Sequence, residues 1–310
     1  MVTIIMCTYN GEKYIREQLQ SIADNTVTEW NILISDDQST DNTIQIAREF
    51  QKQYPDKIQI KVNDTKKGAI INFLSSIYQV GAKMEKDDFI MLCDQDDIWN
   101  PDKIEKTIGD MNNLIKTYGN EMPLLVCTDV TVVDDEMKII HESFRKMNNY
   151  QIRHLDFAHL MMENKVQGCT TMINKSLAMM LYKLPHKATM HDGWLALIAS
   201  AFGHIAYTDE QTMKYRQHID NVQGSIAYKD DVKNKFSNLG GQRQIVINTT
   251  SQIGEFLDIY GEKIPEHIKN AAKAFATLSQ QNFFTRRYNI IKYHMWKSGL
   301  MRNIGLMILI

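Results

Sequence analysis

Three carboxylates follow directly after a strongly apolar segment in the first third of the chain. The segment is Phe89–Cys93, and Asp94, Asp96 and Asp97 come next, interrupted only by Gln95. Like charges gathered at a strand end repel each other unless a cation neutralises them, and hard oxygen ligands select Mg²⁺ or Mn²⁺. A divalent ion held there could bridge a diphosphate and stabilise it as a leaving group.

This acidic segment has two alternative interpretations, a calcium-binding EF-hand loop and a helix cap. In an EF-hand loop, Ile98 would occupy a ligand position and the glycine that the loop requires is absent, so an EF-hand is disfavoured. Alternatively, Asp97 and Asp102 would be solvated residues that cap the following helix. The capping interpretation stays open.

Two polar clusters follow the first two apolar segments. The first is Thr8–Glu12, with the sequence Thr-Tyr-Asn-Gly-Glu, and the second is Asp36–Asp41, with the sequence Asp-Asp-Gln-Ser-Thr-Asp. Ligands of an open parallel sheet bind at the carboxyl ends of its strands, so the clusters are expected to share one crevice. A carboxylate can accept the imide N–H of uracil or thymine, and the Tyr9 ring can pack on the base. Turn formation and helix capping are the alternative explanation.

Three further segments carry polar groups near the ends of predicted elements. Asp192 precedes an apolar amphipathic run and, taken alone, is more typical of a helix cap. Arg216 and His218 end a predicted strand and could meet a diphosphate or a metal, although a lone histidine is usually structural. The stretch Lys66–Phe73 enters a helix through Gly68, where lysines could hold phosphate, but an ordinary loop fits equally well.

A regular alternation of strands and helices must position these groups. Residues 1 to about 130 alternate short apolar runs with longer amphipathic ones, which is typical of a parallel sheet with helical crossovers. The predicted strands are Val2–Cys7, Trp30–Ser35, Ile58–Val62, Phe89–Cys93 and Leu124–Thr128, and the predicted helices are Glu12–Ala23, Thr40–Gln53, Ala69–Ala82 and Pro101–Tyr118.

The pattern becomes mixed after Thr128. It predicts a hairpin through Val130–Ile140, a helix at His154–Glu163, a strand at Cys169–Ile173, and helices from Lys175 and from Asp192. From about Tyr228 the chain reads helical, with a break at Ile264-Pro265.

Composition limits the class of protein. With 310 residues, of which 44% are hydrophobic and 23% charged, the chain can bury a large core. A net charge of -2 gives no basic field for nucleic acid. The four cysteines show no CxxC spacing, no window resembles a membrane-spanning helix, and the first residues read as a strand. We therefore expect a reduced, cytoplasmic protein.

Taken in order, these motifs resemble those of the family 2 glycosyltransferases. The resemblance rests on the motifs Thr-Tyr-Asn, Asp-Asp-Gln-Ser-Thr-Asp and Asp-Gln-Asp-Asp-Ile-Trp. The motifs occur in the family's order, and the match covers roughly residues 1–225. Within the family, the chain is similar to bacterial rhamnosyltransferases of cell-surface polysaccharide synthesis. The resemblance implies a GT-A α/β fold, a Rossmann-like mixed sheet flanked by helices, with a helical C-terminal lobe. The expected domains are a glycosyltransferase domain at 1–227, with a nucleotide-binding half at 1–130 and an acceptor-binding half at 131–227, and a helical region at 228–310.

The resemblance also implies roles for individual residues. Asp192 would be the catalytic base, since an inverting displacement needs one carboxylate to take the proton from the acceptor hydroxyl. The ion would be Mn²⁺ or Mg²⁺, held by Asp94, Asp96 and His218, while Arg216 and His218 would meet the diphosphate. The nucleotide would contact Thr8, Tyr9, Asn10, Glu12, Asp37, Asn72, Asp94 and Gln95. The donor or acceptor sugar would meet Asp97, Trp99, Gly168, Cys169, Thr170, His191 and Trp194, with Gly193 standing where similar members often carry an aromatic residue, and Asn221 would belong to the loop of His218.

The expected reaction is transfer of L-rhamnose from dTDP-β-L-rhamnose to a saccharide acceptor, with inversion. A UDP-hexose or UDP-N-acetylhexosamine donor is the alternative, because a carboxylate such as Asp37 does not distinguish uracil from thymine. A non-catalytic nucleotide-sugar-binding protein is a second alternative. A dinucleotide oxidoreductase is disfavoured, because Thr-Tyr-Asn-Gly replaces GxGxxG after the first strand.

The last segment, Arg286 to Ile310, is basic and apolar. This content is typical of an amphipathic segment at a membrane surface, and packing within the helical lobe or a homodimer interface explains it equally well. We hypothesise peripheral contact with the inner face of the plasma membrane, because rhamnosyltransferases that build polymers use lipid-linked acceptors.

Overall fold

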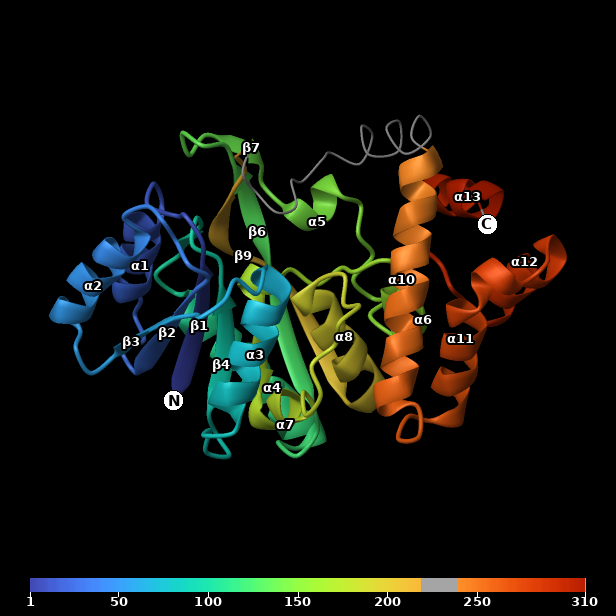
Figure 1. The fold of residues 1–310 in the computed structure, drawn as a ribbon, viewed down its shortest axis with the longest axis horizontal. Coiled ribbons are helices and arrows are strands. Elements are labelled where there is room, and N and C mark those ends of the chain that lie inside the picture. Colours follow the sequence, from blue (N-terminus) through green and yellow to red (C-terminus); the bar gives the residue numbers. More distant parts are fainter. Residues whose placement is uncertain (219–238, 310) are drawn as a thin grey trace. The chain divides into compact units, whose positions relative to one another are not determined.

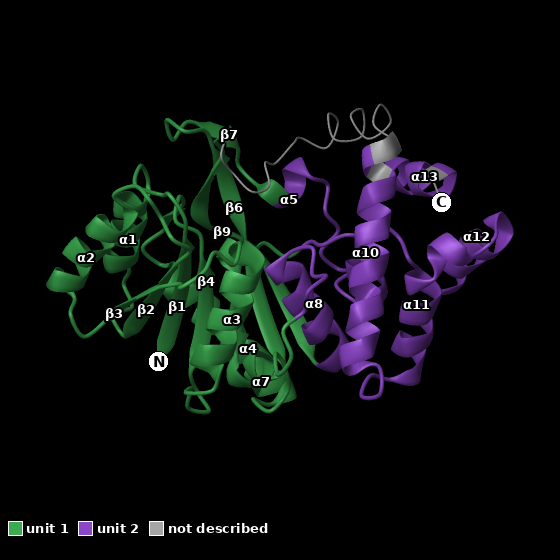
Figure 2. Cartoon of the chain, viewed as in Figure 1, with its two compact units in different colours: residues 1–144, 166–184, 203–224 green, residues 145–165, 185–202, 225–310 purple. Residues whose placement is uncertain are grey.

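The computed structural model describes residues 1–218 and 239–309. The chain forms two compact units that interleave along the sequence (Figures 1 and 2). Unit 1 consists of residues 1–144, 166–184 and 203–224, and unit 2 of residues 145–165, 185–202 and 225–310. The expected domain boundary at 227/228 lies outside the described residues, as does Asn221, and the division at that point stays a proposal.

Unit 1 is built on one mixed sheet. Its described residues form nine strands in the order β3-β2-β1-β4-β8-β6-β9-β5, with β7 paired to β6. Strands β1 to β4 run parallel, β8 is antiparallel to both β4 and β6, and β9 is parallel to β6. The bounds are β1 Val2–Thr8, β2 Trp30–Asp36, β3 Ile58–Val62, β4 Phe89–Cys93, β5 Ile98–Trp99, β6 Leu124–Val133, β7 Ile139–His141, β8 Met172–Asn174 and β9 His204–Arg216.

The five strands predicted for the first 130 residues are confirmed, as is the hairpin that follows them. All five residues of β4 are buried, which explains its continuous apolar sequence. The strand predicted at Cys169–Ile173 begins later, at Met172, because Gly168–Thr170 form a 3₁₀ turn instead. The fold is therefore the expected α/β arrangement with a mixed sheet.

Three of the four helices predicted for the first 130 residues begin two or three residues later than predicted. Polar residues before α2 explain one shift: the Asp41 carboxylate accepts the Thr43 N–H at 3.0 Å, so a turn precedes the helix. The bounds are α1 Ile15–Ala23, α2 Thr43–Gln53, α3 Ala69–Gly81, α4 Lys103–Tyr118 and α7 Lys175–Met179, while α5 Phe144–Met147 crosses from unit 1 into unit 2.

Unit 2 is helical in its described residues. Its helices are α6 Phe157–Met162, α8 His191–Phe202, α10 Leu239–Tyr260, α11 Glu266–Ala276, α12 Phe283–Lys292 and α13 Leu300–Leu309, with a 3₁₀ turn at Leu278–Gln280. The predicted break at Ile264-Pro265 is confirmed, because α10 ends before it and α11 begins after it. No helix among the described residues has the length and apolar character needed to cross a membrane.

Glu163 fastens the C-terminal helices to the rest of unit 2. Its carboxylate accepts hydrogen bonds from Arg302 Nη1 at 3.0 Å and from the Ser298 N–H at 2.8 Å. Arg302 Nη1 also donates to the Asn148 carbonyl at 3.0 Å. The side chains of Arg302 and Glu163 are 4% and 10% exposed, so this ion pair is screened from water.

Replacing Arg302 by methionine is expected to lower the free energy of unfolding by about 3–5 kcal/mol, because it leaves the Glu163 carboxylate buried without its cation. Urea unfolding at equilibrium measures the loss. The exposed Lys292→Met change is the matched control. A double variant with Glu163→Met should recover much of the stability, because no unpaired charge remains; equal losses in the single and double variants would contradict this explanation.

Candidate active site

The carboxyl ends of three neighbouring strands bring the predicted polar clusters together in unit 1. Thr8 pairs with Asp36 in the β1–β2 register, and Met6 pairs with Cys93 in the β1–β4 register. The Thr8 hydroxyl donates to Asp36 at 2.8 Å. The acidic segment after β4 therefore begins beside the loops after β1 and β2, as the sequence predicted.

The loop after β1 is tied to both of its neighbours. Gln95 accepts the Tyr9 N–H at 2.9 Å and donates to the Tyr9 carbonyl at 3.1 Å. Asn10 accepts the Thr40 N–H at 2.9 Å, and Glu12 accepts the Asn42 N–H at 2.9 Å. Asn10, Glu12 and Gln95 thus serve as connectors between loops.

Asp37 organises the loop before α3. Its two oxygens accept the backbone N–H groups of Lys67 and Gly68 at 2.8 and 2.7 Å, and Asn63 donates to it at 3.2 Å. Gly68 has φ 76°, a left-handed conformation that glycine adopts without strain. The loop in turn brings the Lys66 ammonium to 3.5 Å from the centre of the Tyr9 ring. Tyr9 is 43% exposed, which leaves this aromatic ring accessible.

Replacing Asp37 by asparagine is expected to raise the donor KM about tenfold or more, since hydrogen bonds to a charged group are each worth about 1.5–3 kcal/mol. The amide can accept only one of the two backbone N–H groups well. Initial rates over a donor concentration series measure the change, with the exposed Asp64→Asn as control. An unchanged KM would mean that the Lys67 loop does not contribute to donor binding.

Asn72 is an internal connector. Its amide oxygen accepts from Ser35 Oγ at 2.6 Å and Asn63 at 3.0 Å, and its amide nitrogen donates to the Ser35 carbonyl at 2.8 Å. The residue is 1% exposed. Its side chain therefore bonds internal partners in this structure, and the nucleotide contact expected of it stays a prediction. No motif pointed to its partner Asn63.

The acidic segment after β4 crowds negative charge. Ligand atoms of Asp94, Asp97 and Cys169 lie within 4.8 Å of one another, and Asp96 bonds His218 Nε2 at 2.9 Å. Burial, followed by the charges of Asp96 and Asp94, raises the pKa of Asp97 well above its ordinary value. Burial and then the nearby aspartates likewise raise the pKa of Cys169.

This donor set fits a divalent cation. A cation would relieve the mutual repulsion of Asp94, Asp96 and Asp97, and carboxylate oxygens are the ligands that Mg²⁺ and Mn²⁺ prefer. With its raised pKa, the Cys169 thiol stays protonated at neutral pH and is a poor ligand beside them. The carboxylates, with His218, are therefore the groups that would hold the ion.

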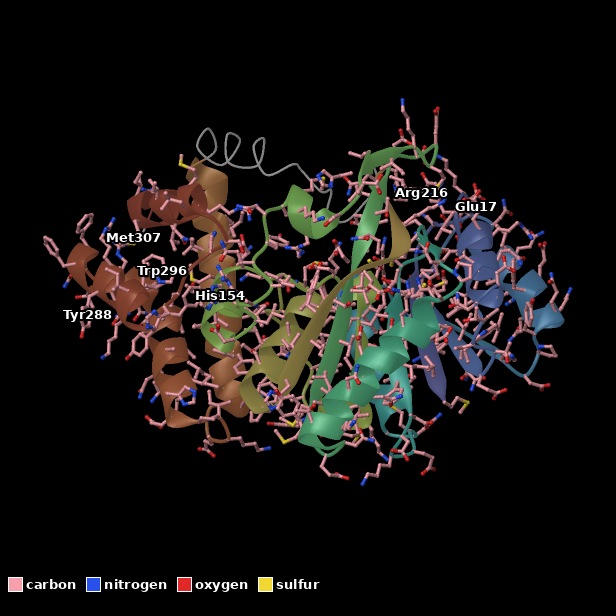
Figure 3. The ribbon with its side chains drawn as sticks, turned by 180° about the vertical axis from the view of Figure 1, so that it is seen from behind. Glu17, His154, Arg216, Tyr288, Trp296 and Met307 are labelled. Carbon is pink, nitrogen blue, oxygen red and sulfur yellow. The ribbon has the colours of Figure 1, made fainter. Side chains whose placement is uncertain are left out.

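Arg216 supports the acidic segment from within the protein (Figure 3). Its guanidinium bonds the Glu17 carboxylate at 2.5 Å and the Asp96 carbonyl at 3.0 Å, and its backbone N–H donates to Asp97 at 3.0 Å. Arg216 is 4% exposed and lies over the Tyr14 ring. In this structure these partners give Arg216 a supporting role, and its contact with the diphosphate stays a prediction. The sequence did not reveal the partner Glu17, because that residue lies on α1.

Both tryptophans of the predicted sugar site lie in the core. Trp99 is 2% exposed and Trp194 is 0% exposed. Within unit 2, Trp194 packs against Phe256 and Tyr260 of α10, with ring centres 5.5 and 6.2 Å away. Neither ring is accessible in this structure, and the sugar contact expected of each stays a prediction. Gly168, Cys169 and Thr170 are also buried, in the 3₁₀ turn before β8.

Asp192 lies in the first turn of α8, in unit 2. Its Oδ1 accepts Asn164 Nδ2 at 2.9 Å and the Gly193 N–H at 2.6 Å, so the carboxylate is held in one orientation. A β-carbon at Gly193 would make ordinary van der Waals contact with the Asn164 amide, at 3.4 Å. The neighbouring His191 is buried, and burial lowers its pKa, which keeps its imidazole neutral. Asn164 carried no sequence signal.

Comparison with known proteins agrees with this arrangement. The model of glycosyl transferase family 2 matches residues 3–162. A dTDP-rhamnosyl transferase, RfbG of Shigella flexneri, is 33% identical over 238 residues, which cover 74% of this chain and 77% of that protein. The β-1,3-glucosyltransferase WfgD of Escherichia coli, named for a UDP-Glc donor, is 34% identical over 39% of this chain and 45% of its own length.

A solved structure shows the same fold. The mannosyltransferase PcManGT of Pyrobaculum calidifontis, in complex with GDP-Man and Mn²⁺, superposes with a TM-score of 0.54 at 14% identity, over 99% of this chain and 78% of that one. The family match spans more than half of the chain, and the Shigella relative is similar along most of its length. The chain therefore belongs to glycosyl transferase family 2 and is a glycosyltransferase with the GT-A fold.

Proposed function

We propose that this glycosyltransferase moves L-rhamnose from dTDP-β-L-rhamnose to a hydroxyl of a lipid-linked precursor of a cell-surface polysaccharide, with inversion. One observation supports the choice of sugar, the 33% identity to a dTDP-rhamnosyl transferase over most of both chains. The charge and position of the acidic segment at the carboxyl edge of the sheet support the use of a nucleoside diphosphate donor.

In the proposed reaction Asp192 is the base. The acceptor oxygen forms a bond to the anomeric carbon while the bond from that carbon to the diphosphate oxygen breaks on the opposite face. The hydroxyl proton passes to the Asp192 carboxylate, and the electron pair of the broken bond leaves with the nucleoside diphosphate. Because Asn164 and the Gly193 N–H both bond Oδ1, the carboxylate is already oriented before the acceptor arrives.

Mn²⁺ or Mg²⁺ is the proposed cofactor, held by Asp94, Asp96 and His218. When bound, it would supply positive charge to the leaving diphosphate. The other proposed contacts are with the base, from Thr8, Tyr9 and Asp37. Their location on the loops after β1 and β2 is consistent with this assignment.

A UDP-hexose donor is the second candidate. It is favoured by the match to WfgD, whose name specifies UDP-Glc, although that match covers less than half of either protein. Asp37 would accept the imide N–H of uracil and of thymine equally well. The base pocket therefore does not separate the two candidates.

A donor panel tests the proposal. The purified chain is incubated with dTDP-rhamnose, dTDP-glucose, UDP-glucose and UDP-N-acetylglucosamine, each with Mn²⁺ or Mg²⁺, and release of the nucleoside diphosphate is followed. Fastest release from dTDP-rhamnose supports rhamnosyl transfer. Release from a UDP-sugar alone would replace it by the second candidate.

We further propose that the enzyme works in the cytoplasm, at the inner face of the plasma membrane, where a lipid-linked acceptor is accessible. The exposed apolar residues of α12 and α13 support peripheral membrane contact. The same residues are compatible with a homodimer, which analytical ultracentrifugation without lipid would detect.

A further inference from the structure

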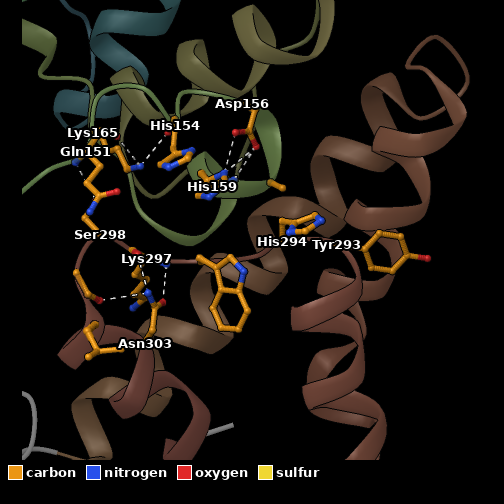
Figure 4. A pocket seen from close by; sticks show the side chains of 14 residues that line it. Gln151, His154, Asp156, His159, Lys165, Tyr293, His294, Lys297, Ser298 and Asn303 are labelled. Carbon is orange, nitrogen blue, oxygen red and sulfur yellow. Dashed lines mark hydrogen bonds and ion pairs between the residues drawn. The ribbon is translucent and has the colours of Figure 1, made fainter.

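A pocket in unit 2 lies outside all the residues proposed for glycosyl transfer. Its volume is about 700 Å³, and its lining comes from residues 151–165, from the turn between α12 and α13 and from the start of α13 (Figure 4). Asp156 is the one carboxylate among the described lining residues, and it bonds His159 Nδ1 at 2.7 Å. The cationic or titratable nitrogen groups of the lining belong to His154, His159, Lys165, His294 and Lys297.

Lys165 gives this lining an interior positive charge. The residue is 1% exposed, and its ammonium donates to the carbonyls of His154 and Gln151 at 2.8 and 3.3 Å. In residues 1–218 and 239–309, no carboxylate lies within 4.0 Å of it. A buried ammonium without an ion pair is costly, and an anion in the pocket would offset that cost. The positive charges of Lys165 and Lys297 also make it unfavourable for a metal ion to bind at His154, Asp156 and His159.

The turn that closes the pocket is held in one conformation. Asn303 accepts the Lys297 N–H at 2.8 Å and donates to the Lys297 carbonyl at 2.9 Å. The Ser298 N–H bonds Glu163, which fixes the turn to the opposite wall. The lining is therefore preformed, which lowers the entropic cost of binding a ligand.

Exposed apolar side chains begin at the rim of the pocket. Leu300 lines the pocket and is 75% exposed, and α13 continues the same face with Met301, Ile304 and Ile308. Helix α12 ends at Lys292, directly before the lining residue Tyr293, and exposes Phe284, Tyr288 and Ile291 at helical spacing. Arg287 joins the two helices by donating to the Met307 carbonyl at 2.6 Å.

The charge of this part of the chain is entirely positive. Residues 267–310 contain no aspartate or glutamate, and their lysines and arginines are Lys269, Lys273, Arg286, Arg287, Lys292, Lys297 and Arg302. The chain as a whole has a net charge of -2, so the positive charge is concentrated here. Exposed apolar faces combined with basic residues are typical of a surface that binds anionic lipid.

We infer that unit 2 binds an anionic phospholipid, with the lipid phosphate in the pocket beside Lys165 and Lys297 and the acyl chains along the exposed faces of α12 and α13. The inference deepens the proposed membrane contact, on which it rests, by naming a headgroup site. It is independent of the sugar that the enzyme transfers.

Trp296 provides a local signal for the test. It lines the pocket and is partly exposed, whereas Trp30, Trp99 and Trp194 are at most 3% exposed. The full chain is mixed with vesicles of phosphatidylcholine alone, with added phosphatidylglycerol, or with added oleate at equal surface charge. Phosphatidylglycerol vesicles should shift tryptophan emission to shorter wavelength, and brominated acyl chains should quench it. In Trp296→Phe the emission change should disappear while cosedimentation with vesicles persists.

Two substitutions probe the headgroup site and the apolar faces. Lys297→Glu changes the local charge by two and should weaken vesicle binding about thirtyfold, since each basic residue near an anionic surface contributes about fivefold. Ile304→Glu should weaken it without touching the pocket. Lys52→Glu on α2 and Tyr78→Glu on α3, where the Tyr78 side chain is as exposed as Ile304, are the matched controls and should bind normally.

Equal binding to phosphatidylglycerol and oleate vesicles would overturn the proposed phosphate site. Unchanged vesicle binding by both Lys297→Glu and Ile304→Glu would overturn the proposed lipid-binding surface. Nucleotide binding and donor turnover are measured on the same preparations. If the unsubstituted chain turns over normally but does not bind phosphatidylglycerol vesicles, this inference alone is defeated. If it binds those vesicles but shows no turnover, the proposed function alone is defeated.

Discussion

Replacing Asp192 by asparagine is expected to lower kcat by about 10²–10⁴-fold, the contribution typical of a positioned general base. The amide cannot take the proton from the acceptor hydroxyl, but it can still accept the hydrogen bonds from Asn164 and the Gly193 N–H. The fold and the donor KM should therefore stay close to those of the unchanged enzyme. Steady-state rates with saturating donor and acceptor measure the effect.

The control for Asp192 is Asp258→Asn, an exposed carboxylate on α10 of the same unit. It removes the same charge at a surface position and should leave turnover unchanged. Full transfer activity in Asp192→Asn would show that another group takes the proton. Equal losses in both variants would point to a general charge effect instead of a base.

Replacing Asp96 by asparagine is expected to lower the transfer rate by about 10²-fold or more. The Mn²⁺ midpoint, which is the Mn²⁺ concentration that gives half of the maximal rate, should also rise, because a neutral amide is a weaker ligand for a hard cation than a carboxylate. The amide can still pair with His218, which bonds Asp96 at 2.9 Å. Initial rates across a Mn²⁺ titration separate lost affinity from lost catalysis.

Asp102→Asn is the matched control for Asp96. Asp102 lies six residues further along the chain, is half exposed and pairs with Lys106 on the surface of α4. Its replacement should leave the Mn²⁺ midpoint in place. An Asp96 variant with an unchanged midpoint would place the metal on other carboxylates, with Asp94 and Asp97 as the remaining pair.

The sheet could be predicted because its signal is local. β4 is buried along its whole length, so its apolar run and the carboxylates that end it are visible without knowledge of any partner. β9 is different: only its end at Arg216 was predicted. Its pairing with β6 shifts register twice, and its middle carries Asp209 and Glu210, so no simple period marks it.

Where the structure places a predicted site residue inside the protein, the cause is burial by remote segments. Trp194 is buried because α10 places Phe256 against it, 62 positions later in the chain. The Arg216 guanidinium bonds the carboxylate of Glu17, which lies 199 positions earlier in the chain. Asn164, which orients Asp192, lies in a loop whose position no pattern of hydrophobicity encodes. The residue types indicate which chemical roles are possible. Tertiary contacts determine which of these side chains already bond other groups of the protein.

Of three consecutive residues, Glu163 bonds the C-terminal helices, Asn164 bonds the proposed base, and Lys165 lines the pocket of unit 2. This proximity affects how deletion experiments should be interpreted. A chain trimmed before Phe283 would strip Glu163 of both its partners, one peptide bond away from the residue that orients Asp192. Inactivity after such trimming would report a disturbed base as much as a lost membrane anchor, so single substitutions on the exposed faces of α12 and α13 are the cleaner way to separate targeting from turnover.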